Sequence, residues 1–158
     1  MAFELSVERA QKLDQIVARY PAAMAATLPA LRLAQEQDGW VSVDAMRWIA
    51  DRLKVPLAHV QGVASFYTLY HKEPVGKNVI QVCRTLSCAM RGGEAILRRC
   101  ADKLGVAVGG TKGDFTLETA ECLASCGTAP VLTVNDEFHE NMTADKLDAL
   151  LSQLGAAK

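Results

Sequence analysis

Two pairs of cysteines constrain this chain more than any other feature of its sequence. Cys83 and Cys88 have four residues between them, Cys122 and Cys126 have three, and thirty-three residues separate the pairs. Each pair comes directly after a short segment that is typical of a β-strand. We therefore expect the two cysteine loops to emerge at the carboxyl ends of their strands, where they could face one another.

The grouping of the cysteines as two plus two predicts a [2Fe–2S] cluster. Such a cluster has two tetrahedral irons that share two sulfides, so each iron needs two further ligands, which are usually thiolates. One pair of cysteines can serve each iron. We predict that Cys83, Cys88, Cys122 and Cys126 hold one cluster.

The segments around the cysteines suit an anionic group. Arg91-Gly92-Gly93 leads into a predicted helix whose N-terminal amides would point toward the cluster, and Gly127 would let backbone amides approach its sulfurs. Arg84 and Arg91 are candidates for additional positive charge. Ordinary turns would also select these glycines, and simple solvent exposure would also account for the arginines.

The sequence also allows other roles for the cysteines. Four thiolates can make a closed structural zinc site, although zinc ribbons usually place two residues between paired cysteines. Neither pair has the Cys-x-x-Cys spacing of a thioredoxin-type thiol, which argues against disulfide exchange. The fifth cysteine, Cys100, shares an apolar helix face with Leu97 and Leu104, so we predict a buried core thiol.

Helical periodicity runs through the N-terminal part of the chain. We expect four helices in a first domain, residues 1–75: residues 6–20 with Ser6 as N-cap and Pro21 as stop, about 27–37 ending at Gly39, Ser42 to Leu53 before Pro56, and a short helix from Pro56.

The pattern changes after Pro74-Val75-Gly76, where a second domain, residues 76–158, is expected to begin. Its predicted order is β-α-β-β-α: strands over 78–82, 115–120 and 131–134, a return strand over 137–140, and helices over 94–104 and 143–154. This is the order of a small thioredoxin-like layer. The predicted fold class is therefore α+β, with an N-terminal helical bundle followed by a thioredoxin-like α/β domain that carries the cluster.

Composition excludes several classes of function. Seventeen basic and eighteen acidic residues give a formal charge of −1, which does not indicate nucleic-acid binding. Apolar runs fall well short of the roughly 20 residues that span a bilayer, so we expect no direct membrane insertion. The first ten residues lack the apolar core of a signal peptide. We expect a cytoplasmic protein that reaches the inner membrane only through partners.

Catalytic motifs are missing from the sequence. It has no Gly-x-Gly-x-x-Gly fingerprint after a predicted strand, so NAD and FMN would have to bind another subunit. His59, His71 and His139 have no nucleophile partner at motif distance and are predicted to be surface or packing residues. We expect no catalytic residue and no self-sufficient enzyme.

Taken together, these residues resemble the thioredoxin-like [2Fe–2S] subunit that lies beside the NADH-oxidising flavoprotein of respiratory complex I. The resemblance runs nearly the whole chain, through Gly39-Trp40, residues 62–68 and 74–77, the first cysteine loop, and residues 121–126 with Ala129-Pro130. It implies that the four paired cysteines are the cluster ligands, in agreement with the spacing.

The resemblance also implies partners. They are a flavoprotein subunit that binds FMN and NAD and a further iron–sulfur subunit, most commonly in an NADH:quinone oxidoreductase. Similar subunits serve NAD-dependent formate dehydrogenases and NAD-reducing hydrogenases, and the cysteines do not separate these hosts. Family members often have Gly between the third and fourth ligands, where this chain has Ala124-Ser125.

Two local features allow more than one interpretation. The aromatic residues Trp40, Phe66, Tyr67 and Tyr70 could dock the flavoprotein or pack in the helical core. Pro130 stands where thioredoxin-like folds often place a cis-proline beside the redox site, so a cis Ala129–Pro130 bond is a hypothesis to test.

Overall fold

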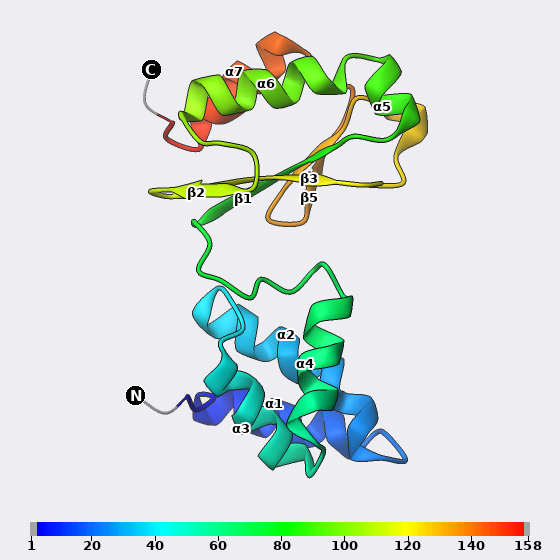
Figure 1. Ribbon diagram of the computed structural model, residues 1–158, viewed down its shortest axis with the longest axis vertical. Coiled ribbons are helices and arrows are strands. Elements are labelled where there is room, and N and C mark those ends of the chain that lie inside the picture. Colours follow the sequence, from blue (N-terminus) through cyan, green and yellow to red (C-terminus); the bar gives the residue numbers. More distant parts are fainter. Residues whose placement is uncertain (1–2, 157–158) are drawn as a thin grey trace. The chain divides into compact units, whose positions relative to one another are not determined.

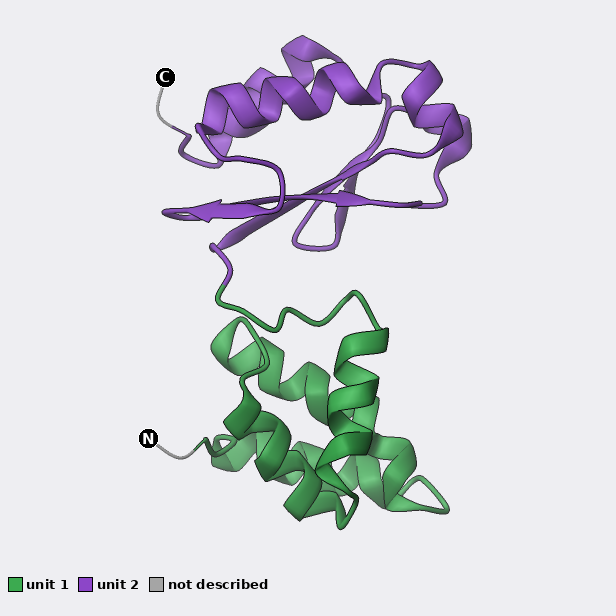
Figure 2. Cartoon of the chain, viewed as in Figure 1, with its two compact units in different colours: residues 1–74 green, residues 75–158 purple. Residues whose placement is uncertain are grey.

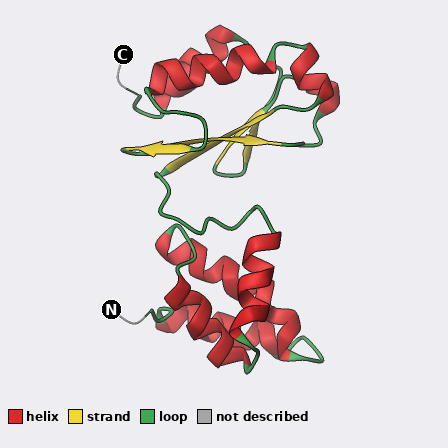
Figure 3. Cartoon of the chain, viewed as in Figure 1, coloured by secondary structure: helices red, strands yellow, loops and turns green. Residues whose placement is uncertain are grey.

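The computed structural model describes residues 3–156, and the chain divides into two compact units between Pro74 and Val75 (Figures 1 and 2). The first unit is built from helices and the second combines helices with a sheet, as the colouring in Figure 3 shows. The predicted α+β class is confirmed. That each unit is a separately folding domain stays a prediction.

The helical unit contains four α-helices and one 3-10 helix: α1 (Val7–Val17), η1 (Ala23–Ala26), α2 (Thr27–Asp38), α3 (Val43–Leu53) and α4 (Leu57–Phe66). The Ser42 hydroxyl caps α3 by accepting the Ala45 amide at 3.0 Å, and Gly39 ends α2 with a left-handed φ of 80°. The first helix ends at Val17, three residues before the predicted Tyr20.

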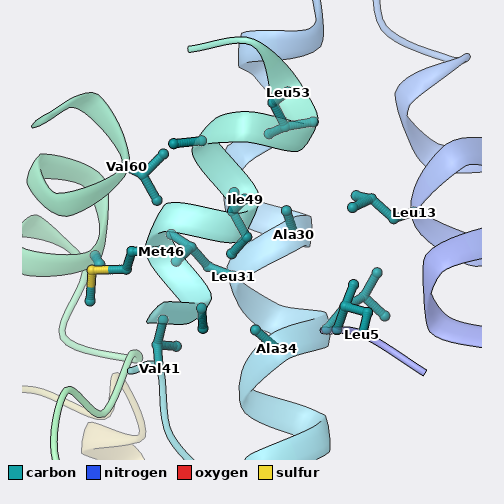
Figure 4. Close-up of a cluster of buried hydrophobic side chains, with 14 of the residues drawn as sticks. Leu5, Leu13, Ala30, Leu31, Ala34, Val41, Met46, Ile49, Leu53 and Val60 are labelled. Atoms are coloured by element: carbon teal, nitrogen blue, oxygen red, sulfur yellow. The ribbon is translucent and has the colours of Figure 1, made fainter. Parts of the chain in front are cut away.

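The core of the helical unit is formed by apolar side chains from all four helices (Figure 4). Leu13, Leu31, Ile49 and Val60 are fully buried in it. Tyr70 follows α4 and belongs to the same core, since it is only 3% exposed and its hydroxyl donates to the Leu28 carbonyl at 2.8 Å. Of the four aromatic candidates for docking, Tyr70 is therefore a core residue.

The second unit holds a mixed sheet of five strands in the order β2-β3-β1-β4-β5. Only β1 and β3 run parallel; the other pairs are antiparallel. Helices α6 and α7 cover one face of this sheet (Figure 1). The elements are β1 (Asn78–Cys83), α5 (Leu86–Met90), α6 (Gly93–Leu104), β2 (Gly110–Lys112), β3 (Phe115–Ala120), η2 (Cys126–Thr128), β4 (Leu132–Val134), β5 (Glu137–His139) and α7 (Ala144–Gln153).

Besides the 3-10 helix η2, two elements of this unit were not expected from the sequence. Strand β2 is short and polar, and it exists because Gly110 to Lys112 pair antiparallel with Phe115 to Leu117. Helix α5 is a short turn of five residues inside the first cysteine loop. Within residues 3–156, no helix is both long enough and apolar enough to cross a membrane.

Candidate functional site

The two cysteine loops leave the sheet at the same edge. Strands β1 and β3 pair in parallel over six positions, from Asn78 opposite Phe115 to Cys83 opposite Ala120. The backbone amide of Arg84 then donates to the Ala120 carbonyl at 3.0 Å, which holds the two exits together. The expected position of both loops at carboxyl ends of strands is confirmed, with Cys83 itself as the last residue of β1.

The first pair of cysteines is buried. Cys83 and Cys88 are 3% and 2% exposed, and they form a small apolar cluster with Ala129 and Val131, against which Leu123 packs. The two thiols lie close enough to shift each other's pKa. The loop that contains α5 thus folds back so that the side chains of its first and last ligand candidates meet.

The second pair of cysteines is exposed, but its loop reaches the first pair. Leu123 packs against the buried pair and its amide lowers the pKa of Cys83, while the charge of Cys126 raises the pKa of Cys88. Within residues 3–156, no group of three or more His, Cys, Asp or Glu side chains is arranged around a position for a single metal ion. The structure packs Cys83 and Cys88 together and places Leu123, from the loop that carries Cys122 and Cys126, against them.

Backbone amides lie near the cysteine sulfurs. Those of Thr85 and Leu123 lower the pKa of Cys83, and that of Val131 acts in the same direction on Cys88. Separately, the Ala124 amide donates to the sulfur of Cys122 at 3.3 Å. Hydrogen bonds of this kind stabilise thiolates and are one of the means by which proteins tune iron–sulfur clusters. This donor set fits a group held by four thiolates.

The same surroundings shift the pKa values of Cys83 and Cys88 in opposite directions. Burial raises the pKa of Cys83, but the amides of Thr85 and Leu123 and the Cys88 thiol lower it by more. The pKa of Cys83 therefore lies below its ordinary value. Burial and the neighbouring Cys83 and Cys126 raise the pKa of Cys88. The pKa of Cys83 is thus lowered and that of Cys88 raised by the same surroundings.

One of the glycines near the cysteines is required by close packing of the backbone, and the role predicted for Gly127 stays a prediction. A Cβ on Gly93, the first residue of α6, would lie 2.8 Å from the Cys88 carbonyl oxygen and 3.2 Å from that of Cys83. Close approach of backbone to backbone thus requires glycine there. A Cβ on Gly127 would meet no atom within 4 Å, so the protein itself supplies no steric reason for glycine at that position.

The two arginines of the first loop are exposed. Arg84 lies 3.8 Å from the Glu121 carboxylate, and both side chains face solvent. Arg91 is likewise exposed. Solvent screens exposed charges, so these side chains stabilise an anionic group less than a buried arginine would.

A carboxylate that sequence reasoning missed lies beside the second loop. Glu140, just after β5, accepts hydrogen bonds from the hydroxyls of Ser125 and Thr128, the latter at 2.8 Å. These hydroxyls flank Cys126. No local pattern connects Glu140 to residues twelve and fifteen positions earlier in the chain, so only the tertiary structure could identify it.

Other predicted features of the site are resolved by the structure. The Ala129–Pro130 peptide bond is cis, as hypothesised, and Ala129 packs against the buried cysteine pair. Cys100 is fully buried among the side chains of the second core, and burial raises its pKa to about 12. The prediction of a core thiol is confirmed.

His59 lies in the helical unit, outside this site. It is half-buried, and its Nε2 shares a hydrogen bond of 3.2 Å with the Thr27 hydroxyl, in keeping with a packing role.

Comparison with known proteins gives one consistent family. Residues 13–155 match the family model for the thioredoxin-like [2Fe–2S] ferredoxin. One relative, from the NADH-quinone oxidoreductase of Rickettsia bellii, is 40% identical over 146 residues, which cover 89% of this chain and 87% of the relative. Another, from the NADH-quinone oxidoreductase of Rhizobium meliloti, is 40% identical over 150 residues, which cover 94% and 89%.

A solved structure with the same fold is a chain of an NAD⁺-reducing [NiFe]-hydrogenase in its air-oxidised state. It superimposes with a TM-score of 0.69 at 18% identity, over 85% of this chain and 23% of the hydrogenase chain. At that identity the likeness concerns the fold.

Proposed function

The chain belongs to the family of thioredoxin-like [2Fe–2S] ferredoxins, and on this premise we propose that it is an electron-transfer subunit whose single cluster is held by Cys83, Cys88, Cys122 and Cys126. The observation that carries the proposal is the meeting of the two cysteine loops at the paired ends of β1 and β3. Two pairs of thiolates at one sheet edge match the ligand demand of two irons.

The residues of the chain have separable tasks at this site. Four thiolates would bind the irons, and the amides of Thr85, Leu123, Ala124 and Val131 would stabilise their negative charge. When bound, a [2Fe–2S] cluster takes up and releases one electron at a time. The apolar surroundings of the first pair exclude water, whereas the exposed second pair leaves that side of the site accessible to a partner.

The partner in this proposal is a flavoprotein subunit that carries FMN and NAD, with a further iron–sulfur subunit in the same complex. The names of the relatives favour an NADH:quinone oxidoreductase as the host. An NAD-dependent formate dehydrogenase or an NAD-reducing hydrogenase is the alternative host. This chain would contribute no catalytic side chain and would reach the membrane only through the complex.

The iron and sulfide content of the purified chain is the first test of the proposal. We expect a red-brown protein with two irons and two acid-labile sulfides per chain, and an electron paramagnetic resonance (EPR) signal after reduction by dithionite. Serine at any of the four paired cysteines should lower iron content strongly, and Cys100→Ala is the matched control that should retain full iron. A colourless chain with one zinc and no iron would instead support a zinc-stabilised binding module without a redox role.

The partner is tested separately, in the complex. The chain should co-purify with an FMN-containing subunit, and NADH should reduce its cluster only when that subunit is present. Direct reduction of the isolated chain by NADH at the same rate would contradict the proposal. Co-purifying membrane subunits would identify the quinone oxidoreductase, and a molybdenum-containing chain would identify the formate dehydrogenase.

A further inference from the structure

We propose that Glu140 is a positioning residue for the cluster, which acts through Ser125 and Thr128 on the loop that carries Cys122 and Cys126. The inference rests on the proposed cluster site. It assigns to a carboxylate outside both cysteine loops the task of fixing the exposed half of that site.

The geometry joins one carboxylate oxygen to both sides of Cys126. Glu140 Oε1 accepts the hydroxyl of Ser125, directly before the cysteine, and the hydroxyl of Thr128, two residues after it, at 2.8 Å. The two hydroxyl oxygens lie 2.6 Å apart. Hydrogen bonds to a charged acceptor are among the stronger ones in proteins. The carboxylate therefore fixes the chain on either side of a predicted ligand.

Glu140 is itself held by the backbone. The next residue, Asn141, donates its amide to the Thr128 carbonyl at 2.7 Å, and Met142 donates to the Pro130 carbonyl at 2.9 Å. The segment after β5 thus runs alongside the end of the second cysteine loop. Glu140 is exposed and follows the last residue of β5, and this attachment fixes the backbone that carries it to the end of the second loop.

The second loop needs such an anchor more than the first. Cys122 and Cys126 are exposed, whereas Cys83 and Cys88 are packed in an apolar cluster. Ala124, between the exposed cysteines, adopts a left-handed φ of 57°, which an L-residue with a Cβ rarely does. Groups that orient metal ligands are known to control how tightly the metal is held. Leu123 packs at one end of this loop, and Glu140 supplies that orientation at the Cys126 end.

A fixed negative charge beside an anionic cluster has a second effect. It makes the addition of an electron less favourable, so the carboxylate should keep the reduction potential low. Substitutions can separate the effect of the Glu140 hydrogen bonds from the effect of its charge. Glu140→Gln removes the charge and can still accept a hydroxyl hydrogen bond, whereas Glu140→Ala removes both.

The experiment uses the purified full chain with its cluster. We expect Glu140→Ala to lose iron to a chelator about 10-fold faster than the parent chain, to broaden the EPR signal and to raise the potential. Glu140→Gln should raise the potential while it retains most of the resistance to the chelator. Ser125→Ala removes one donor but keeps the charge, so it should accelerate iron loss with little change in potential.

The matched control is Glu137→Gln on the same hairpin, because Glu137 is exposed and has no side-chain hydrogen bond or ion pair to a described residue. It should leave iron loss, EPR signal and potential unchanged. If the Glu140 variants behave like this control while the parent chain holds its two irons, the role of Glu140 is refuted and the cluster site stands. If the parent chain holds no iron–sulfur cluster, both proposals fail.

Discussion

Cys83 and Ala120 are register partners at the last paired position of two parallel strands. The relationship connects residues thirty-seven positions apart, and it brings the start of one cysteine loop to the start of the other. The packing of Leu123, from the second loop, against Cys83 and Cys88 depends on it. A one-residue slip of β3 would turn its apolar set to the opposite face, so burial of Leu117 fixes this register and with it the site.

Replacement of Ala124 by glycine should stabilise the chain. Ala124 has a φ of 57°, a conformation that costs an L-residue about 1 kcal/mol or more and costs glycine almost nothing. The amide that donates to Cys122 is retained, so iron content should not change. Urea unfolding measures the gain. Ala95→Gly, at an exposed position within α6, is the control and should destabilise by about 1 kcal/mol; a loss of stability in both variants would contradict the prediction.

Replacement of Gly93 by alanine should destabilise the second unit by about 1–3 kcal/mol, because the new Cβ would lie 2.8 Å from the Cys88 carbonyl oxygen. The displaced backbone belongs to the first cysteine pair, so iron content should also fall. Both are measured on the purified chain, by urea unfolding and iron assay. Gly62→Ala lies in open space within α4 and should instead stabilise by about 1 kcal/mol. Equal behaviour of the two variants would argue against the close contact.

Cys100 should be the least reactive cysteine of the folded chain. Its burial and its pKa of about 12 leave almost no thiolate at pH 8. After removal of iron, alkylation followed by mass spectrometry should label the exposed Cys122 and Cys126 first and leave Cys100 unmodified. The denatured chain, in which all five cysteines should react, is the control. Early labelling of Cys100 in folded protein would show that the core is not packed as described.

The ion pairs between α6 and α7 should stabilise the chain at neutral pH and lose this effect in acid. Arg99 and then Lys103 hold Asp148, and its pKa is lowered to about 2. A lowered pKa in the folded state means that the contribution is present above the unfolded pKa of roughly 4 and is lost as pH falls toward 2. Asp148→Asn should therefore be less stable than the parent at pH 7, and the difference should shrink between pH 4 and 2.

Urea unfolding of the iron-free chain at several pH values measures this dependence, because acid would release the cluster. Circular dichroism at pH 7 should first show that the iron-free chain is folded. Asp102→Asn removes the same charge from an exposed position on α6 that has no ion pair to a described residue. A difference that stays constant from pH 7 to pH 2 would rule out the assigned role of Asp148.

Much of the fold was predictable because its signals are local. Helix α3 begins after Ser42, whose hydroxyl caps it, and α6 ends at Gly105 in a left-handed conformation, as expected from side-chain chemistry within one or two turns. Strand β2 was missed because Gly110 to Lys112 have no apolar alternation. They are a strand only because β3 offers them an antiparallel partner.

The sequence by itself determined which residues could hold the cluster, since pairing and spacing of cysteines are properties of the chain, and it separated Cys100 by its place on an apolar helix face. The tertiary structure decided what surrounds those residues. The amides near the sulfurs, the backbone contact at Gly93 and the carboxylate of Glu140 all depend on segments far apart in the chain. Hydrogen bonds and steric contacts act over a few ångströms, so only the folded register brings these groups within reach of one another.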